Sequence, residues 1–173
     1  MRKSIIAILM TFCLSIMTYA QTPRDRATEL KEQAQSSLNQ KDYIKARYLF
    51  KKAYEAFATR ENYPQAIECG VQANALYVRE NFYKEGFELC RDMDQLIWAG
   101  EQNQKKVFYD LRFLVNKERL QMYTALKNPA QAKTQLNKLE ETANLAKNDS
   151  LTEVLLYTKA NYYYTFNQNT QGD

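Results

Sequence analysis

The sequence predicts an all-α fold built from repeated helical hairpins. After the first twenty residues, apolar side chains recur at three- and four-residue steps, and no stretch alternates in the two-residue pattern of a strand. A small residue followed four and seven positions later by apolar residues occurs three times, starting at Ala46, Gly86 and Ala132. Repetition at a period of roughly 20–50 residues is typical of solenoids. Solenoids usually serve as binding surfaces.

The first twenty residues predict a secretory signal peptide. Arg2 and Lys3 give a basic start, residues 4–17 are almost wholly apolar, and small residues stand at the outer positions of Thr18–Ala20. The apolar run is shorter than the about 20 residues that span a bilayer, so an uncleaved anchor is the less favoured alternative. We expect cleavage after Ala20 and a soluble product that is exported to the periplasm or another extracytoplasmic space of a bacterium.

Seven helices are expected after the signal peptide, over residues 23–39, 42–58, 63–79, 82–99, 102–127, 129–147 and 151–167. Pro23 and Pro129 suit the first position of a helix, where no amide hydrogen is needed. Gly100 suits a helix end, which often requires a left-handed residue. Ser150 and Glu153 have the spacing of a capping box that would start the last helix.

The fifth expected helix is unusually long, because one apolar stripe continues along most of it. The stripe consists of Phe108, Leu111, Val115, Met122 and Leu126. Paired in order, the helices form three hairpins and leave one helix over. A length of 173 residues permits one ordinary domain, so residues 21–173 are assigned to one repeat domain.

Cysteines and several tyrosines are expected to serve packing. Cys69 and Cys90 are interpreted as buried free thiols, with a disulfide as the alternative because an exported protein can oxidise them. Tyr48, Tyr77 and Tyr123 are expected to fill helix interfaces while their hydroxyls reach water.

The hairpin pattern resembles the tetratricopeptide repeat, a unit of two antiparallel helices about 34 residues long. The matching packing positions are Ala34, Ala46, Phe50 and Ala53; then Tyr77, Gly86, Cys90 and Met93; then Tyr123, Ala132, Leu136 and Leu139; and finally Leu156, Ala160 and Tyr163. The resemblance covers nearly all of residues 21–173. It departs from the family in its longer repeats and in the missing aromatic, leucine and glycine of most leading helices. It implies a right-handed α-α superhelix of about three and a half hairpins.

The same resemblance implies a concave groove lined by the leading helices. The lining would consist of Lys31, Gln35, Leu38, Val71, Ala75, Val78, Lys117, Gln121, Thr124, Tyr157, Asn161 and Tyr164. The last three residues are spaced by four and three, so they share one stripe of a helix. A mixed polar and aromatic groove suits an extended peptide or a partner helix.

The composition argues against catalysis. The chain has no histidine, which removes histidine-dependent nucleophilic and zinc sites. It has no glycine-rich phosphate loop among its four glycines and no Cys-x-x-Cys pair. The net charge of +4 falls when Arg2 and Lys3 are removed, leaving 22 basic and 20 acidic residues, so nucleic acid is not an expected partner. We expect no enzyme activity, no metal and no cofactor.

We therefore expect a non-catalytic protein- or peptide-binding module. It resembles the amino-terminal repeat region of exported sensor and regulator proteins, including sensor halves of transmembrane histidine kinases. The last helix is rich in apolar side chains, so the chain is expected to continue beyond Asp173 toward an output domain. A dimer or partner interface on that helix is the alternative. The alternative functions are a freestanding periplasmic scaffold or assembly chaperone, and a glycan or small-molecule receptor that uses the tyrosine-rich last helix.

Overall fold

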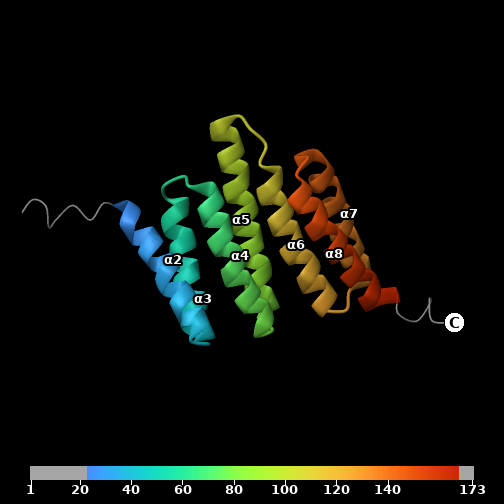
Figure 1. Ribbon diagram of the computed structural model, residues 1–173, viewed down its shortest axis with the longest axis horizontal. Coiled ribbons are helices and arrows are strands. Elements are labelled where there is room, and N and C mark those ends of the chain that lie inside the picture. The colour runs from blue at the N-terminus through green and yellow to red at the C-terminus, as the bar shows by residue number, and fades with distance from the viewer. Residues whose placement is uncertain (1–22, 168–173) are drawn as a thin grey trace, which may run out of the picture.

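The computed structural model describes the backbone of residues 23–167 and the side chains of residues 26–166. The described part is helical apart from its turns, which confirms the all-α class. Its helices are α2 (Pro23–Asn39), α3 (Tyr43–Ala58), α4 (Tyr63–Arg79), α5 (Tyr83–Gln104), α6 (Tyr109–Ala125), α7 (Pro129–Ala146) and α8 (Asp149–Asn167). Figure 1 shows them running from α2 at one end of the molecule to α7 and α8, which overlap in this view, at the other. The expected signal peptide lies outside the described residues.

The helices form two layers. Consecutive helices pack against each other, and in addition α4 contacts α6, and α6 contacts α8. Lys31 Nζ on α2 reaches across to α4, where it donates to Gln65 Oε1 and Glu68 Oε2, both at 2.8 Å. Helices α2, α4, α6 and α8 therefore lie next to one another in what we call the even layer. Helices α3, α5 and α7 form the odd layer.

Four turns between helices have the same backbone geometry. In each turn, one non-glycine residue has a positive φ. Its backbone amide donates to the carbonyl of the residue three positions earlier. The amide of the next residue donates to the carbonyl five positions before that next residue. The four residues are Lys41, Glu61, Asn81 and Lys127. This pattern satisfies the free carbonyls at the end of a helix. The next residue then caps the following helix in three of the four turns, where a side-chain oxygen of Asp42, Asn62 or Asn128 accepts from the amide three positions on.

The small residues of the hairpin pattern lie where helices touch. Ala46 and Ala132 are fully buried, and Gly86 is buried on α5. Gly70 on α4 is a further close contact, because a Cβ there would lie 2.6 Å from Met93 Sδ. These contacts confirm the pattern as a packing signal.

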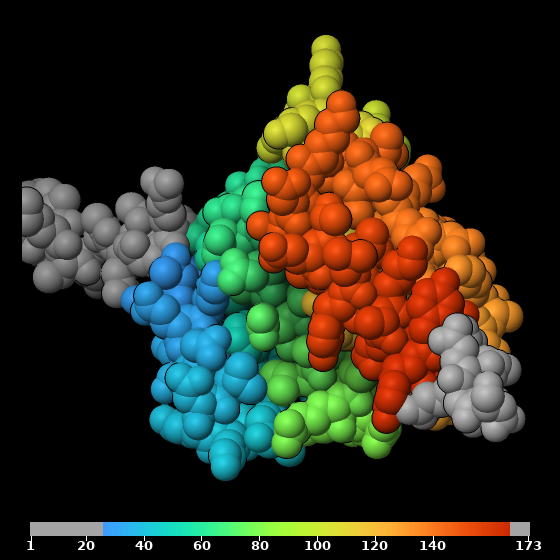
Figure 2. Space-filling model, turned by 45° about the vertical axis from the view of Figure 1, so that its right-hand side comes forward, coloured from blue at the N-terminus to red at the C-terminus, as the bar shows by residue number. Residues whose placement is uncertain are grey.

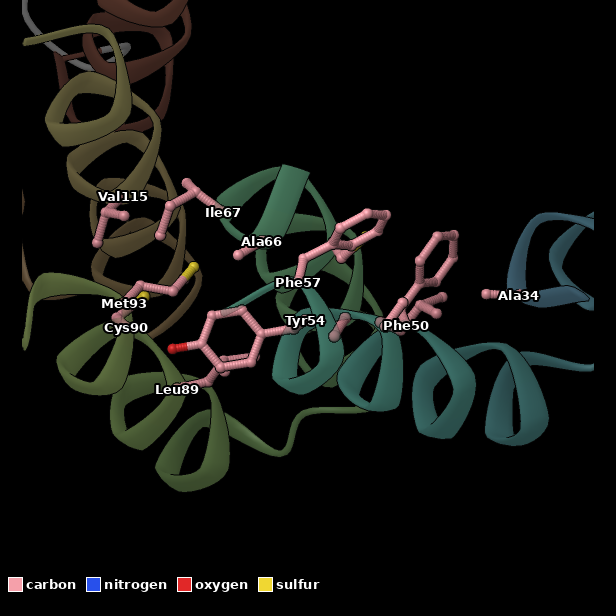
Figure 3. Packing of buried hydrophobic residues seen from close by; sticks show 14 of the residues in the cluster. Ala34, Phe50, Tyr54, Phe57, Ala66, Ile67, Leu89, Cys90, Met93 and Val115 are labelled. Carbon is pink, nitrogen blue, oxygen red and sulfur yellow. The ribbon is translucent and has the colours of Figure 1, made fainter. Parts of the chain in front are cut away.

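The buried apolar residues form two clusters, a larger one that extends from α2 to α6 and a smaller one among α6, α7 and α8. In Figure 3, Tyr54 of α3 points toward Leu89, Cys90 and Met93 of α5. All four side chains are buried. Cys90 is therefore a packing residue.

The boundary between α5 and α6 differs from the predicted one. Helix α5 continues through Gly100 to Gln104 and is the longest described helix, with 22 residues, whereas α6 has 17. A Cβ at Gly100 would lie 2.9 Å from ring carbons of Tyr63 and 2.8 Å from Phe108 Cε2. The glycine is therefore needed for close packing, and the left-handed residue that ends α5 is Lys105, with φ of 51°. Phe108 precedes α6 as its capping residue instead of lying on its stripe.

Two smaller predictions were also wrong. Helix α8 begins at Asp149, before Ser150, because the side chain of Asn148 already accepts a hydrogen bond from the Ser150 amide at 3.0 Å. Tyr48 is 60% exposed, on the same outward face of α3 as Ile44. Tyr77 and Tyr123 are half-buried against the core, as expected.

The packing positions of the first three hairpins are buried or half-buried, but those of α8 are not. Leu156 is 62% exposed, and Ala160 and Tyr163 are also exposed. Within residues 23–167, no helix has the length and apolarity required to cross a membrane.

Candidate functional site

A cavity of about 470 Å³ opens on the even layer between α6 and α8. We call it the α6–α8 groove. It is lined by Val78, Lys117, Leu120, Gln121, Thr124, Ala125, Lys127, Val154, Tyr157, Thr158, Asn161, Tyr162 and Thr165. Its volume lies in the range of small-ligand and peptide-anchor sites. Figure 2 shows α8, in red, on the face turned toward the viewer.

The groove brings together half of the residues that the sequence predicted for it. Those that line it are Val78, Lys117, Gln121, Thr124, Tyr157 and Asn161. They come from α4, α6 and α8, which are distant in sequence and adjacent in the even layer. Residues of three even-layer helices therefore meet at one surface.

The other predicted residues lie on even-layer helices but outside the cavity lining. Lys31 is bound to Gln65 and Glu68, and Gln35 Nε2 donates to Asn39 Oδ1 at 3.1 Å. Three more, Leu38, Val71 and Ala75, also lie outside it. Leu38 and Val71 pack half-buried against the core, and Ala75 is exposed. Tyr164 is 67% exposed and is not among the residues that line the cavity.

Sequence reasoning missed several lining residues on α8. Thr158, Thr165 and Val154 stand three, four and seven residues from Asn161, so they share its face of the helix. That periodicity was available in the sequence. It was not decisive, because Tyr157, Asn161 and Tyr164 fit a neighbouring stripe equally well.

Three threonine hydroxyls give the groove hydrogen-bond acceptors. Thr124 Oγ1 donates to Leu120 O at 2.7 Å, Thr158 Oγ1 to Val154 O at 2.7 Å, and Thr165 Oγ1 to Asn161 O at 2.9 Å. Because each hydroxyl hydrogen is used within its own helix, the oxygen lone pairs face a ligand as acceptors. The side-chain amides of Gln121 and Asn161 add both donors and acceptors. The groove can therefore pair with alternating N–H and C=O groups.

The groove has a positive electrostatic character. Its lining contains two lysines, Lys117 and Lys127, and no carboxylate. Lys117 Nζ lies 3.6 Å from Oε1 of Glu118, whose side chain is buried behind the groove. Burial raises the pKa of Glu118, against the opposing effects of a hydrogen bond from Asn74 and of the Lys117 charge. The charge of Lys117 is thus only partly balanced.

Within residues 23–167, no group of three or more cysteines or carboxylates is placed to hold a metal ion. Comparison of this chain with protein-family models, with curated proteins and with solved structures gives no match. Its function is therefore argued from its own residues.

Proposed function

We propose that this chain is a non-catalytic helical-repeat module that binds a peptide segment of another protein in the α6–α8 groove. The observation that carries the proposal is the convergence of Lys117, Gln121, Tyr157 and Asn161 on one cavity. An extended peptide presents donors and acceptors in alternation, and this lining offers partners for both. Tyr157, which is 77% exposed, adds a large apolar contact at the edge.

The proposal includes the finer architecture that the sequence predicted. We take the even helices as the leading helices of tetratricopeptide-like hairpins in a right-handed superhelix of about three and a half units. The contacts of α4 with α6 and of α6 with α8 support this reading. So do the four turns of shared geometry.

The proposed setting is outside the cytoplasm, as the sensory or scaffolding amino-terminal part of a larger signalling protein. The basic start, apolar run and small-residue site in residues 1–20 support export. Expression with these residues in a bacterial host, followed by fractionation and amino-terminal sequencing, tests it. A mature product starting at Gln21 in the periplasm is expected, and a cytoplasmic product that retains Met1 would contradict export.

Panning a phage-displayed library of random peptides on the purified chain tests the binding function. The parent chain should enrich a family of related sequences. The Tyr157→Ala and Asn161→Ala variants should lose at least about tenfold in affinity for them, as expected for a lost anchor contact. Tyr164→Ala is the matched control, because Tyr164 is an exposed tyrosine of the same helix outside the cavity. Enrichment that is indifferent to all three substitutions, or no enrichment, would overturn the proposal.

A further inference from the structure

A second and larger cavity opens between α5 and α7 of the odd layer, and it shares no lining residue with the α6–α8 groove. Its volume is about 630 Å³. Helix α6 forms its floor, and α5 and α7 form its walls on either side; Figure 1 shows α6 between them. The lining consists of Asp94, Ile97, Trp98, Val107, Tyr109, Arg112, Asn116, Arg119, Lys138, Glu141, Thr142 and Leu145. We call this cavity the Trp98 groove.

The floor of the Trp98 groove is a single stripe of α6. Tyr109, Arg112, Asn116 and Arg119 follow one another at steps of three and four. At 1.5 Å per residue, this stripe is about 15 Å long. The groove is therefore elongated, and it suits a short linear ligand that lies along α6.

Apolar side chains are exposed along the walls of the groove. Trp98 is the only tryptophan of the chain, and it is 62% exposed. Val107 and Leu145 are 45% and 49% exposed. An exposed tryptophan at the edge of a cavity offers a flat apolar face to a ligand.

The two arginines of the floor are held in place by carboxylates of α5. Arg112 donates through Nε and Nη2 to the two carboxylate oxygens of Glu101, with the Nε contact at 2.7 Å. Arg119 Nη2 donates to Asp94 Oδ2 at 2.6 Å and to Cys90 O at 3.0 Å. Within the described part of the chain, no hydrogen bond uses Nη1 of either arginine. The groove thus holds fixed donors whose positive charges are already balanced.

The charge balance favours an uncharged ligand. The lining cations Arg112, Arg119 and Lys138 are matched in number by Asp94, Glu141 and the Glu101 behind Arg112. An anion would gain little from guanidinium groups that are already paired. Hydroxyl groups, in contrast, can accept from the free N–H groups and donate to the carboxylates.

We propose that the Trp98 groove binds a neutral oligosaccharide. The C–H face of a sugar ring would stack on the indole of Trp98. Neighbouring hydroxyls would hydrogen-bond to Arg112, Asn116 and Arg119 along the floor. The site differs in place and in ligand class from the peptide groove between α6 and α8.

The single tryptophan makes the test direct, because the tryptophan fluorescence of the full chain reports only on this groove. Cellohexaose, maltohexaose, xylohexaose and mannohexaose are titrated in turn. At least one should change the fluorescence saturably, with an affinity that is the same in low and high salt. No change with any of the four, confirmed by the absence of heat in calorimetry, would overturn the proposal.

Variants locate the binding. Calorimetry should give about a tenfold or larger loss of saccharide affinity for Trp98→Ala. Asn116→Ala should also weaken binding, and the Asn116 side chain makes no hydrogen bond within the described part of the chain. Tyr157→Ala, in the other groove, is the control and should bind as the parent does. Saccharide binding that survives Trp98→Ala, or displacement of the signal by the phage-selected peptides with strong salt dependence, would assign the groove to a different ligand.

Discussion

Asn74 on α4 and Glu118 on α6 form a hydrogen-bonded pair within the even layer, with Asn74 Nδ2 donating to Glu118 Oε2 at 3.0 Å. Both side chains are essentially inaccessible to solvent. Asn74 Oδ1 is also buried and has no hydrogen-bond partner. An ionised Glu118 cannot donate to that oxygen, whereas its protonated form can. A neutral side chain at position 118 would therefore pair with Asn74 better than an ionised carboxylate does.

Glu118→Gln is expected to raise the free energy of unfolding at pH 7 by about 1 kcal/mol. The amide of the new side chain can donate to Asn74 Oδ1 while its oxygen keeps the existing hydrogen bond. Urea unfolding of parent and variant measures the difference. Glu118→Ala is the control, and it should destabilise the chain because it leaves both polar atoms of Asn74 unpaired.

The pH dependence of that difference follows from the raised pKa of Glu118. Folded Glu118 keeps its proton to higher pH than unfolded Glu118, whose ordinary pKa is 4.5. The parent therefore loses stability as pH rises above that value, until pH passes the pKa of the folded carboxyl. The advantage of Glu118→Gln should grow over that window. A constant difference between pH 4 and pH 7 would contradict burial of a titrating carboxyl.

Glu101→Gln is expected to lower the free energy of unfolding at pH 7, whereas Glu118→Gln raises it. The Arg112 guanidinium holds the pKa of Glu101 below its ordinary value of 4.5, and Glu101 Oε1 also accepts from the Phe108 amide at 2.9 Å. The ionised carboxylate therefore contributes stability above pH 4.5, which is lost as pH falls through the folded pKa. Because Arg112 is partly exposed, a loss of about 1 kcal/mol is expected at pH 7. Glu88→Gln, at an exposed position of the same helix, is the control and should change the urea midpoint at pH 7 little.

Gly100→Ala is expected to destabilise the chain. The added methyl group meets the rings of Tyr63 and Phe108, and overpacking costs about 1–3 kcal/mol. That cost exceeds the about 1 kcal/mol that alanine gains over glycine inside a helix. The penalty should shrink in a Phe108→Ala background, since one of the two rings is then absent. An equal penalty in both backgrounds would mean that backbone conformation, and not ring contact, requires the glycine.

Ala46→Leu tests the packing role of the small residues. Ala46 is fully buried on α3, so a leucine should cost about 1–3 kcal/mol in urea unfolding. Ala160→Leu is the matched control, because Ala160 is exposed on α8 and a change there should stay within about 0.5 kcal/mol. Equal effects at the two positions would show that Ala46 is not a helix contact.

The two described cysteines are expected to be unreactive in the folded chain. Both are buried free thiols, and burial raises the pKa of each to about 12. Because the thiolate is the reactive form, dithionitrobenzoate at pH 8 should label neither until the chain is unfolded. In guanidinium, both thiols should become accessible and react. The thiol of Cys13 should react as well if residues 1–20 are retained. Rapid labelling without denaturant would mean that the core opens locally.

The sequence predicted helix content and most helix ends, because proline, capping side chains and helical periodicity act locally. The prediction that Gly100 ends a helix was wrong for a physical reason. A glycine can serve a left-handed turn or a close contact, and only the positions of Tyr63 and Phe108 distinguish the two. The starts of three helices also follow a regular pattern in the sequence. Helices α3, α4 and α5 begin at tyrosines spaced by twenty residues, Tyr43, Tyr63 and Tyr83.

Only part of the groove could be predicted, because a groove depends on how far each helix is rotated about its axis. A rotation of one residue separates the stripe containing Tyr164 from the one containing Thr165, and both read as plausible surfaces. The Trp98 groove was harder still. Its walls come from α5 and α7, and one of its arginines, Arg112, is positioned by Glu101, which lies eleven residues away on another helix.

The four turns with left-handed lysine, glutamate or asparagine have a practical consequence for engineering. A side chain in that conformation costs about 1–2 kcal/mol relative to glycine. Replacing Lys41 and Glu61 by glycine would thus remove that cost at sites that line neither groove. These replacements are therefore expected to raise the free energy of unfolding without changing the lining of either groove.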